Sequence, residues 1–189
     1  LTYDALVPGY GVTGRLSQLY RYVQMPGEAH RQLLPTPGLK HGLHGLNLFK
    51  KDCRRVYLTE GVWDGMALWE VLKIAKADES GMTGAEAGSL LADASVLAVP
   101  SATVWQDAWL GFFAGKEVVL MFDSDHPRLN GNRVIPPTGA AGMQRMASIL
   151  AKAAQPPRSI SWLAWGPEGF DPARPSGFDV RDWLTGGGE

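Results

Sequence analysis

The sequence predicts an α/β protein in which helices cover a parallel β-sheet, preceded by a small β-rich region. From residue 54 onward, short apolar segments typical of buried strands alternate with longer segments whose apolar residues recur at helical spacing. That alternation is typical of a parallel sheet covered on both faces. The first 50 residues are instead rich in Gly and Pro, which mark turns. The length of 189 residues suits one domain or one domain with a small appendage.

Four strands and several helices follow from this pattern. Strands are expected at Val56–Thr59, Val96–Val99, Glu117–Phe122 and Ile160–Leu163. Helices are expected at Asp64–Ala77, Trp105–Phe113 and Gly139–Ala154, with an Ala/Gly-rich helical insertion at Ser80–Ala92 and a last short helix at Asp182–Leu184. Asp125–Thr138 has three prolines and no clear period, which favours a polar loop.

The N-terminal region differs from the rest in composition and in charge. Leu16–Val23 mixes aromatic, β-branched and polar residues, which predicts a strand, and Pro-Gly segments on its C-terminal side predict turns. Residues 1–55 carry eight Lys and Arg against three acidic residues, whereas the remainder carries ten against 16. The net charges are therefore +5 and −6. A polyanion suits the first part and metal ions the second, although solvated surface charges explain the same asymmetry.

We therefore expect two domains, a basic β-rich subdomain over residues 1–52 and an α/β domain over residues 53–189. The composition, with 45% apolar and 20% charged residues, is that of an ordinary globular protein. A single cysteine, Cys53, excludes a disulfide framework and argues against a Cys-based zinc site. No apolar run approaches the roughly 20 residues of a membrane span. We expect a soluble, cytoplasmic protein, and the initial Leu1 suggests an excised fragment.

Acidic residues follow two of the predicted strands. Glu60 comes directly after the first strand, and Asp123 and Asp125 come after the third. Functional groups gather at the carboxyl ends of parallel strands, so these three carboxylates converge if the two strands are neighbours. Residues two apart on an extended segment point the same way. Such a pair suits Mg²⁺, and Glu60 suits either a further ligand or a general base.

Two further carboxylates stand near predicted helix starts. Asp64 lies at the beginning of the first helix and Asp179 shortly before the last one. Either residue could serve mainly as a helix-start or capping residue, because a carboxylate is favourable there. Each of these acidic features is weak alone, and their order and placement at strand ends make the combination specific.

The motifs resemble those of the Toprim domain. Glu60-Gly61-Val62-Trp63-Asp64 resembles its first motif, in which a Glu follows the first strand, and Asp123-Ser124-Asp125 resembles its Asp-x-Asp motif. The segment 178–184 resembles a late acidic motif of primase members. The resemblance implies a Toprim-like parallel sheet with Glu60, Asp123 and Asp125 as catalytic and metal-binding residues. It also implies that Asp64 and Asp179 contribute to the metal site.

The N-terminal segment extends the resemblance to bacterial-type primases. Gly14-Arg15-Leu16, Tyr20-Arg21-Tyr22 and Leu43-His44-Gly45-Leu46 are similar to the stretch that precedes the Toprim domain in those enzymes. In that family this region supplies basic residues for template and nucleotide. The resemblance therefore implies nucleotide or DNA binding by Arg15, Arg21 and Lys40, together with Arg181 in the late motif.

The sequence also departs from the bacterial pattern. A Gly-Ala segment usually follows Asp-x-Asp directly, but here residues 126–138 intervene before Gly139. Phe178 stands where the late motif often has Lys. Phage and plasmid primases tolerate such insertions, which favours an origin in a phage or another mobile element. No Cys/His cluster and no phosphate-binding Gly-x-x-x-x-Gly-Lys loop is present, so a zinc-binding module or replicative helicase would lie outside this chain.

These observations predict the catalytic core of a DNA primase, which uses Mg²⁺ or Mn²⁺, nucleoside triphosphates and a single-stranded DNA template to make a short primer. Two alternatives remain. One is a metal-dependent Toprim nuclease or topoisomerase fragment. The other is a non-catalytic Toprim module that binds nucleic acid in a replication complex.

A few other residues have two interpretations. His41 and His44 suit surface or turn positions, or else a metal or phosphate site, and His126 suits a loop residue or a metal ligand. Trp105 and Trp109 lie four residues apart, which favours packing in the core over stacking on a single-stranded base.

Overall fold

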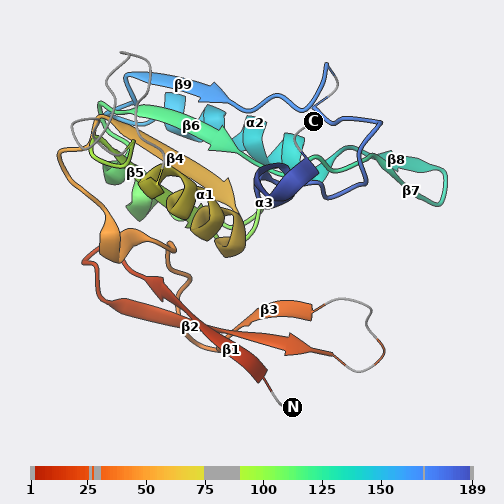
Figure 1. Cartoon of the computed structure of the whole chain (residues 1–189), viewed down its shortest axis with the longest axis horizontal. Coiled ribbons are helices and arrows are strands. Elements are labelled where there is room, and N and C mark those ends of the chain that lie inside the picture. The colour runs from red at the N-terminus through yellow and green to blue at the C-terminus, as the bar shows by residue number, and fades with distance from the viewer. Residues whose placement is uncertain (1–2, 26, 28–30, 75–89, 168, 188–189) are drawn as a thin grey trace.

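The fold was analysed on a computed structural model, which describes residues 3–25, 27, 31–74, 90–167 and 169–187. It confirms a mixed α/β architecture with a parallel sheet flanked by helices and a separate small antiparallel sheet (Figure 1). The predicted division between residues 52 and 53 stays a prediction. No described helix has the length and apolarity that crossing a membrane requires.

The parallel sheet has four strands in the order β5-β4-β6-β9. These strands are β4 (Arg55–Glu60), β5 (Ala94–Val99), β6 (Glu117–Met121) and β9 (Ser159–Trp162). All neighbouring pairs are parallel, and β4 lies directly between β5 and β6. The strands that precede Glu60 and Asp123 are therefore neighbours, as the convergence of the carboxylates requires.

Each face of the parallel sheet is covered by helices (Figure 1). On one face, Val56, Leu58, Val118 and Leu120 pack with residues of α2 (Thr138–Ala151) and of a 3₁₀ helix, η2 (Asp107–Phe112). On the other face, α1 (Val62–Ile74) and α3 (Val180–Asp182), which continues into η3 (Trp183–Gly187), cover the alternate side chains. This alternation follows from the two-residue period of a strand.

The N-terminal sheet is antiparallel, in the order β1-β2-β3, with β1 (Tyr3–Tyr10), β2 (Leu16–Gln24) and β3 (Arg31–Pro35). Between it and the parallel sheet runs a connecting segment that includes η1 (Leu46–Leu48). Leu43 forms a bridge with Tyr10, and His44 forms an antiparallel bridge with Ala98 of β5. The connecting segment thereby attaches β1 to the edge of the parallel sheet.

His44 is buried, at 3% exposure, so the expectation of a surface or turn position was wrong for this residue. Its Nδ1 lies 2.8 Å from the Pro8 carbonyl oxygen, and its ring packs against Tyr20. Burial lowers the pKa of His44 to about 4. His41 hydrogen-bonds through Nδ1 to the Tyr20 hydroxyl at 2.9 Å. These histidines hold the connecting segment against the N-terminal sheet.

Several expected elements need correction. The first helix begins at Val62 rather than Asp64, and the helix expected at Trp105–Phe113 is a shorter 3₁₀ helix. The expected polar loop 125–138 contains a two-stranded hairpin, β7 (Arg128–Asn130) and β8 (Arg133–Ile135). Most of the expected helical insertion at Ser80–Ala92 lies outside the described residues, and the described residues 90–93 form a turn.

Candidate active site

The candidate site lies at the carboxyl ends of β4 and β6. Glu60 is the last residue of β4, and Asp123 follows β6 by two residues. Gly61 then turns the chain at φ +87°, a conformation that costs glycine little because it has no Cβ. The Gly61 amide donates to the Val99 carbonyl at 3.0 Å, so the turn is held against the end of β5.

Among the described residues, only one of the two carboxylate oxygens of Glu60 has a hydrogen-bond partner. Its Oε1 accepts a hydrogen bond from the Ala102 amide at 3.1 Å, whereas Oε2 is buried with no hydrogen-bond partner among the described residues. Burial, reinforced by the negative charge of Asp125, raises the pKa of Glu60 to about 7. An orphaned buried carboxylate oxygen is costly unless a proton or a cation meets it.

Asp123 shows the strongest effect of the acidic surroundings. Its pKa is raised to about 9, first by burial and then by the negative charges of Glu60, Asp64, Asp179 and Asp125. Like charges in a desolvated site disfavour ionisation of one another. The mutual effects show that the carboxylates expected to form one site lie close enough to interact.

Asp125 caps the start of α2. Its Oδ2 accepts a hydrogen bond from the Gly139 amide at 2.9 Å, at the positive end of the helix dipole. Gly139 is required because a Cβ at this position would overlap the Asp123 carbonyl oxygen. The helix start therefore lies directly against the Asp-x-Asp segment and fixes its backbone.

Asp64 and Asp179 meet across α1 and α3. Asp64 is buried in the first turn of α1, and its Oδ1 accepts from the Arg181 amide at 3.3 Å. Burial and then the neighbouring Asp179 raise the pKa of Asp64 well above its usual range. Asp179 is the N-cap of α3, where its side chain accepts from the Asp182 amide at 2.7 Å in a capping box. Asp179 thus caps the helix, as one interpretation of the sequence held, and also faces Asp64.

The late motif reaches this edge because it pairs with the end of β6. The Ser124 amide donates to the Phe178 carbonyl at 2.8 Å, and the Gly177 amide donates to the Ser124 carbonyl at 3.0 Å. Segments more than 50 residues apart in sequence therefore lie side by side, and this pairing places Asp179 next to Asp123.

The donor set suits a hard divalent cation, since carboxylate oxygens are the ligands that Mg²⁺ prefers. Glu60 Oε2, which is buried with no hydrogen-bond partner among the described residues, is available to such a cation. Within the described ranges, however, no three Asp, Glu, His or Cys side chains converge closely enough to hold a metal ion as they stand.

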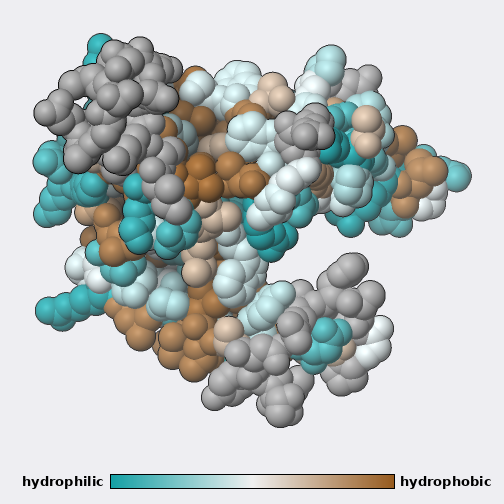
Figure 2. Space-filling model, in the orientation of Figure 1, coloured by the Kyte–Doolittle hydropathy of each residue, from teal (hydrophilic) through white to brown (hydrophobic). Residues whose placement is uncertain are grey.

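The predicted basic residues lie at different places. Arg181 joins the acidic cluster, where its Nη2 donates to Asp179 Oδ2 at 2.8 Å. Arg21 lies on the central strand β2, and its buried Nε has no hydrogen-bond partner among the described residues. Arg15 and Lys40 are exposed near the N-terminal sheet. Among the described residues, no hydrogen bond or ion pair joins Arg15, Arg21 or Lys40 to the carboxylates. Figure 2 shows an open notch between the N-terminal sheet and the body above it.

Other candidate residues have structural surroundings. His126 donates its backbone amide to Ser176 Oγ at 2.9 Å, and its ring packs on Phe170. Trp109 is almost fully buried and meets Trp105 edge to face, which confirms core packing for this pair. His126 therefore packs within the loop region, and the two Trp residues pack in the hydrophobic core.

The sequence analysis did not identify the backbone amides that hold the carboxylates. The amides of Ala102 and Gly139 bind Glu60 and Asp125. Part of the signal was present, because Pro100-Ser101 is a small-residue turn after a predicted strand and Gly139 is the first residue of a predicted helix. What could not be read from sequence is which carboxylate each amide would meet.

Comparison with known proteins bears on the fold. No protein-family model matches the chain, and no curated protein matches it in sequence. Among solved structures, the DnaG catalytic core is similar, with a TM-score of 0.56 and 15% identity over 95% of this chain and 47% of that chain. This chain thus spans about half of that core.

A second similar structure is that of bacteriophage T7 lagging-strand DNA polymerase interacting with primase domains of two gp4 subunits bound to an RNA/DNA hybrid and dTTP. Its TM-score is 0.51, with 13% identity over 97% of this chain and 71% of that chain. The likeness confirms the predicted fold. This chain has the Toprim-like fold of bacterial- and phage-type primases.

Proposed function

We propose that this chain is the catalytic core of a DNA primase, which joins nucleoside triphosphates into a short primer on a single-stranded DNA template. The observation that carries the proposal is the gathering of Glu60, Asp64, Asp123, Asp125 and Asp179 at one edge of a primase-like fold. Their burial and mutual repulsion, which raise the pKa values of Glu60, Asp64 and Asp123, support a role in binding cations.

Glu60, Asp123 and Asp125 would hold Mg²⁺ (or Mn²⁺), with Asp64 and Asp179 contributing from α1 and α3. When bound, the metal would neutralise the triphosphate and stabilise charge on the attacking and leaving oxygens. The amides of Ala102 and Gly139 fix one oxygen each of Glu60 and Asp125, so that the remaining oxygens stay free for this role.

Glu60 also suits the role of proton acceptor. In nucleotidyl transfer the primer 3′-oxygen forms a bond to the α-phosphorus, the bond to pyrophosphate breaks, and the hydroxyl proton must leave. A carboxyl group whose pKa lies at about 7 is well matched to accept a proton near neutral pH.

Arg21, Lys40 and Arg15 would bind phosphate groups of template and nucleotide, and Arg181 would bind phosphate at the metal edge. The similar T7 structure holds an RNA/DNA hybrid and dTTP, which supports the same classes of partner here. We further propose that a zinc-binding module or replicative helicase acts with this chain from outside it. A phage or mobile-element origin and a cytoplasmic location fit that role.

The test is primer synthesis on single-stranded DNA with labelled nucleoside triphosphates and Mg²⁺ or Mn²⁺. The Asp123→Ala/Asp125→Ala variant removes two of the proposed ligands. Asp93→Asn is the matched control, because Asp93 lies at the opposite end of the sheet and is exposed. We expect short products from the unmodified chain and the control, and none from the double variant.

Three other outcomes would change the proposal. Cleavage of the template would favour the nuclease or topoisomerase alternative. DNA binding without any turnover, even with a zinc-binding module or helicase supplied, would favour a non-catalytic module. Equal synthesis by the double variant would show that this carboxylate edge is not the active site.

A further inference from the structure

The hairpin after the Asp-x-Asp motif projects from the carboxylate edge of the molecule (Figure 1). It pairs Arg128 with Ile135, Leu129 with Val134 and Asn130 with Arg133. The two central residues of the turn are Gly131 and Asn132. Gly131 has φ +59°, whereas no described non-glycine residue has a positive φ. A positive φ at the first central residue alone is typical of a type II′ hairpin turn. The hairpin is therefore a regular secondary-structure element of the fold.

The two faces of the hairpin differ in chemistry. Opposed residues of an antiparallel pair share a face, and successive residues alternate between faces. Leu129 and Val134 therefore share one face and are 78% and 61% exposed. Arg128 and Arg133 share the other face with Ile135. The hairpin presents an apolar pair on one side and two arginines on the other.

The arginine face continues into a groove of about 270 Å³ at the base of the hairpin. Ile135 forms one wall of the groove, Thr138 and Arg145 of α2 form another, and Ala102 and Thr103 after β5 form the third. No acidic side chain lines it among the described residues. Arg145 Nη2 donates to the Ala102 carbonyl at 3.2 Å, and Arg128 Nη2 donates to Thr138 Oγ1 at 3.2 Å. Both acceptors are neutral, so the two guanidinium charges are not compensated by these contacts.

The segment 126–138 contains no Asp or Glu at all. For Arg133, no ion pair appears within the described part of the chain. Arg145 lines the groove and Arg128 and Arg133 lie on the hairpin, and none of the three forms an ion pair with a described carboxylate. Such a surface attracts anions and binds phosphate oxygens well, because guanidinium groups can donate two parallel hydrogen bonds.

The groove shares its walls with the carboxylate site. The amide of Ala102, which lines the groove, donates to Glu60, and the amide of Gly139, which follows Thr138, donates to Asp125. A polyanion in the groove would therefore pass directly beside the proposed metal site. A free nucleotide would need only the groove. The exposed Arg133 lies outside the groove, on the projecting hairpin, which favours a longer ligand such as a nucleic-acid strand.

We propose that Arg128 and Arg133 of the hairpin, together with Arg145 in the groove, bind the phosphodiester backbone of the nucleic-acid strand that passes the active site. The inference rests on the proposed function and adds a strand-binding surface to it. The expected contacts are sequence-independent, because phosphate groups carry no base information.

The experiment compares Arg128→Ala/Arg133→Ala with Lys152→Ala/Arg158→Ala in the whole chain. The control removes two exposed cations that do not line the groove, since Lys152 ends α2 and Arg158 precedes β9. Fluorescence anisotropy measures binding of labelled single-stranded DNA and of an RNA/DNA hybrid over a range of salt concentrations. Circular dichroism checks that each variant is folded.

We expect the hairpin variant to bind one or both ligands about 10- to 100-fold more weakly, with the salt dependence of log K reduced by about one to two. The control should change affinity less than about twofold. The ligand that loses more affinity identifies the strand, template or hybrid. The measurement needs no turnover, so it remains informative if the chain makes no primer.

Two results would overturn the inference. The first is an affinity for both nucleic acids that matches the control. The second is unchanged nucleic-acid affinity together with weakened binding of a nucleoside triphosphate, which would assign the arginines to the free nucleotide. A further variant, Leu129→Ser/Val134→Ser, tests the face. A loss of affinity in this variant, with none in the arginine variant, would place the contact on the apolar side instead.

Discussion

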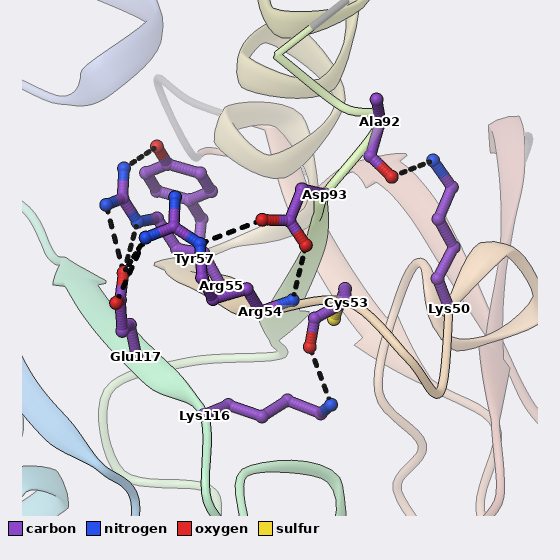
Figure 3. A network of polar contacts seen from close by, with 9 residues as sticks. All are labelled: Lys50, Cys53, Arg54, Arg55, Tyr57, Ala92, Asp93, Lys116 and Glu117. Atoms are coloured by element: carbon purple, nitrogen blue, oxygen red, sulfur yellow. Dashed lines mark hydrogen bonds and ion pairs between the residues drawn. The ribbon is translucent and has the colours of Figure 1, made fainter.

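Charged side chains are arranged in opposite ways at the two ends of the parallel sheet. At the amino ends of β4 and β6, acidic and basic side chains pair with one another (Figure 3). Arg54 Nε lies 2.8 Å from Asp93 Oδ2, and Arg54 Nη1 lies 3.2 Å from Glu117 Oε1. Arg55 Nη2 lies 3.0 Å from Glu117 Oε2. Hydrogen bonds from Arg55 hold the pKa of Glu117 below its usual range.

At the carboxyl ends, by contrast, carboxylates face one another and only Arg181 pairs with any of them among the described residues. Burial and mutual repulsion raise the pKa of Glu60 and Asp123 rather than lowering it. The comparison shows that the same sheet pairs its charges at one end and leaves most of them unpaired, among the described residues, at the other. The uncompensated charge at the other end is the feature on which the proposed cation site rests.

The largest expected effect comes from removing the same chemical group at each end. Glu60→Gln keeps the size of the side chain but removes its charge and its capacity to accept a proton. We expect primer synthesis to fall by about 10²- to 10³-fold, since a positioned general base contributes on that scale. Glu117→Gln at the amino end should leave synthesis within about twofold. Initial rates of primer synthesis under identical metal and nucleotide concentrations measure both.

Comparable losses in the two variants would contradict the functional contrast between the ends. Circular dichroism and thermal unfolding separate that outcome from simple misfolding. If Glu117→Gln lost activity through unfolding, its melting temperature would fall with its rate.

A second prediction concerns the backbone that holds Asp123. In Gly139→Ala the new methyl group would overlap the Asp123 carbonyl oxygen, so the Asp-x-Asp segment or the start of α2 must move. We expect a destabilisation of about 1–3 kcal/mol and a loss of synthesis of about 10- to 100-fold. Gly111→Ala is the matched control, because a Cβ there meets nothing within 4 Å. Denaturant unfolding and rate measurements test both, and equal behaviour of the two variants would contradict the tight packing at Gly139.

The third prediction uses the raised pKa values. Since Glu60 and Asp123 bind protons more tightly in the folded chain than in the unfolded one, their contribution to folding stability is fully present below their ordinary pKa values. It is lost as pH rises through about 7 and about 9. The metal-free melting temperature should therefore fall by several degrees from about pH 5 to about pH 8. Thermal unfolding in the presence of a chelator measures this.

Mg²⁺ or Mn²⁺ should raise the melting temperature more at about pH 8 than at about pH 5, because ligands must be deprotonated to bind. Asp123→Asn should raise the metal-free melting temperature at the higher pH and reduce the response to metal. A metal-free stability that rises with pH would show that the carboxylates are not mutually repelling in solution.

Much of the carboxylate edge could be predicted from sequence because strand ends are local features. Glu60 and Asp123 each follow a short apolar segment, and parallel pairing of adjacent strands then brings them to one edge. Other features depended on partners distant in sequence. The burial of His44 follows from Pro8 and Tyr20, which reach it only once the N-terminal sheet has folded.

The hairpin escaped prediction for a different reason. Its strands have three residues each, too short for a two-residue period to be recognised between prolines. The Gly131-Asn132 dipeptide at its turn was the available signal, since Gly at the first central position of a two-residue loop favours a type II′ hairpin. The groove lined by Arg145 could not be predicted from the sequence, because Arg145 and Ala102 meet only through packing of α2 on the end of β5.

The smallest expected effect is at the compensated end. Arg54→Gln removes the ion pairs of Arg54 with Asp93 and Glu117. The Arg54 side chain is exposed in both pairs. Because exposed pairs are screened by water and salt, we expect the melting temperature to fall by only about 1–3 °C at low salt and by less at high salt. Primer synthesis should not change. A larger loss that persists at high salt would mean that the amino end contributes to the fold through more than surface charge, and the contrast between the two ends would then be weaker than the structure indicates.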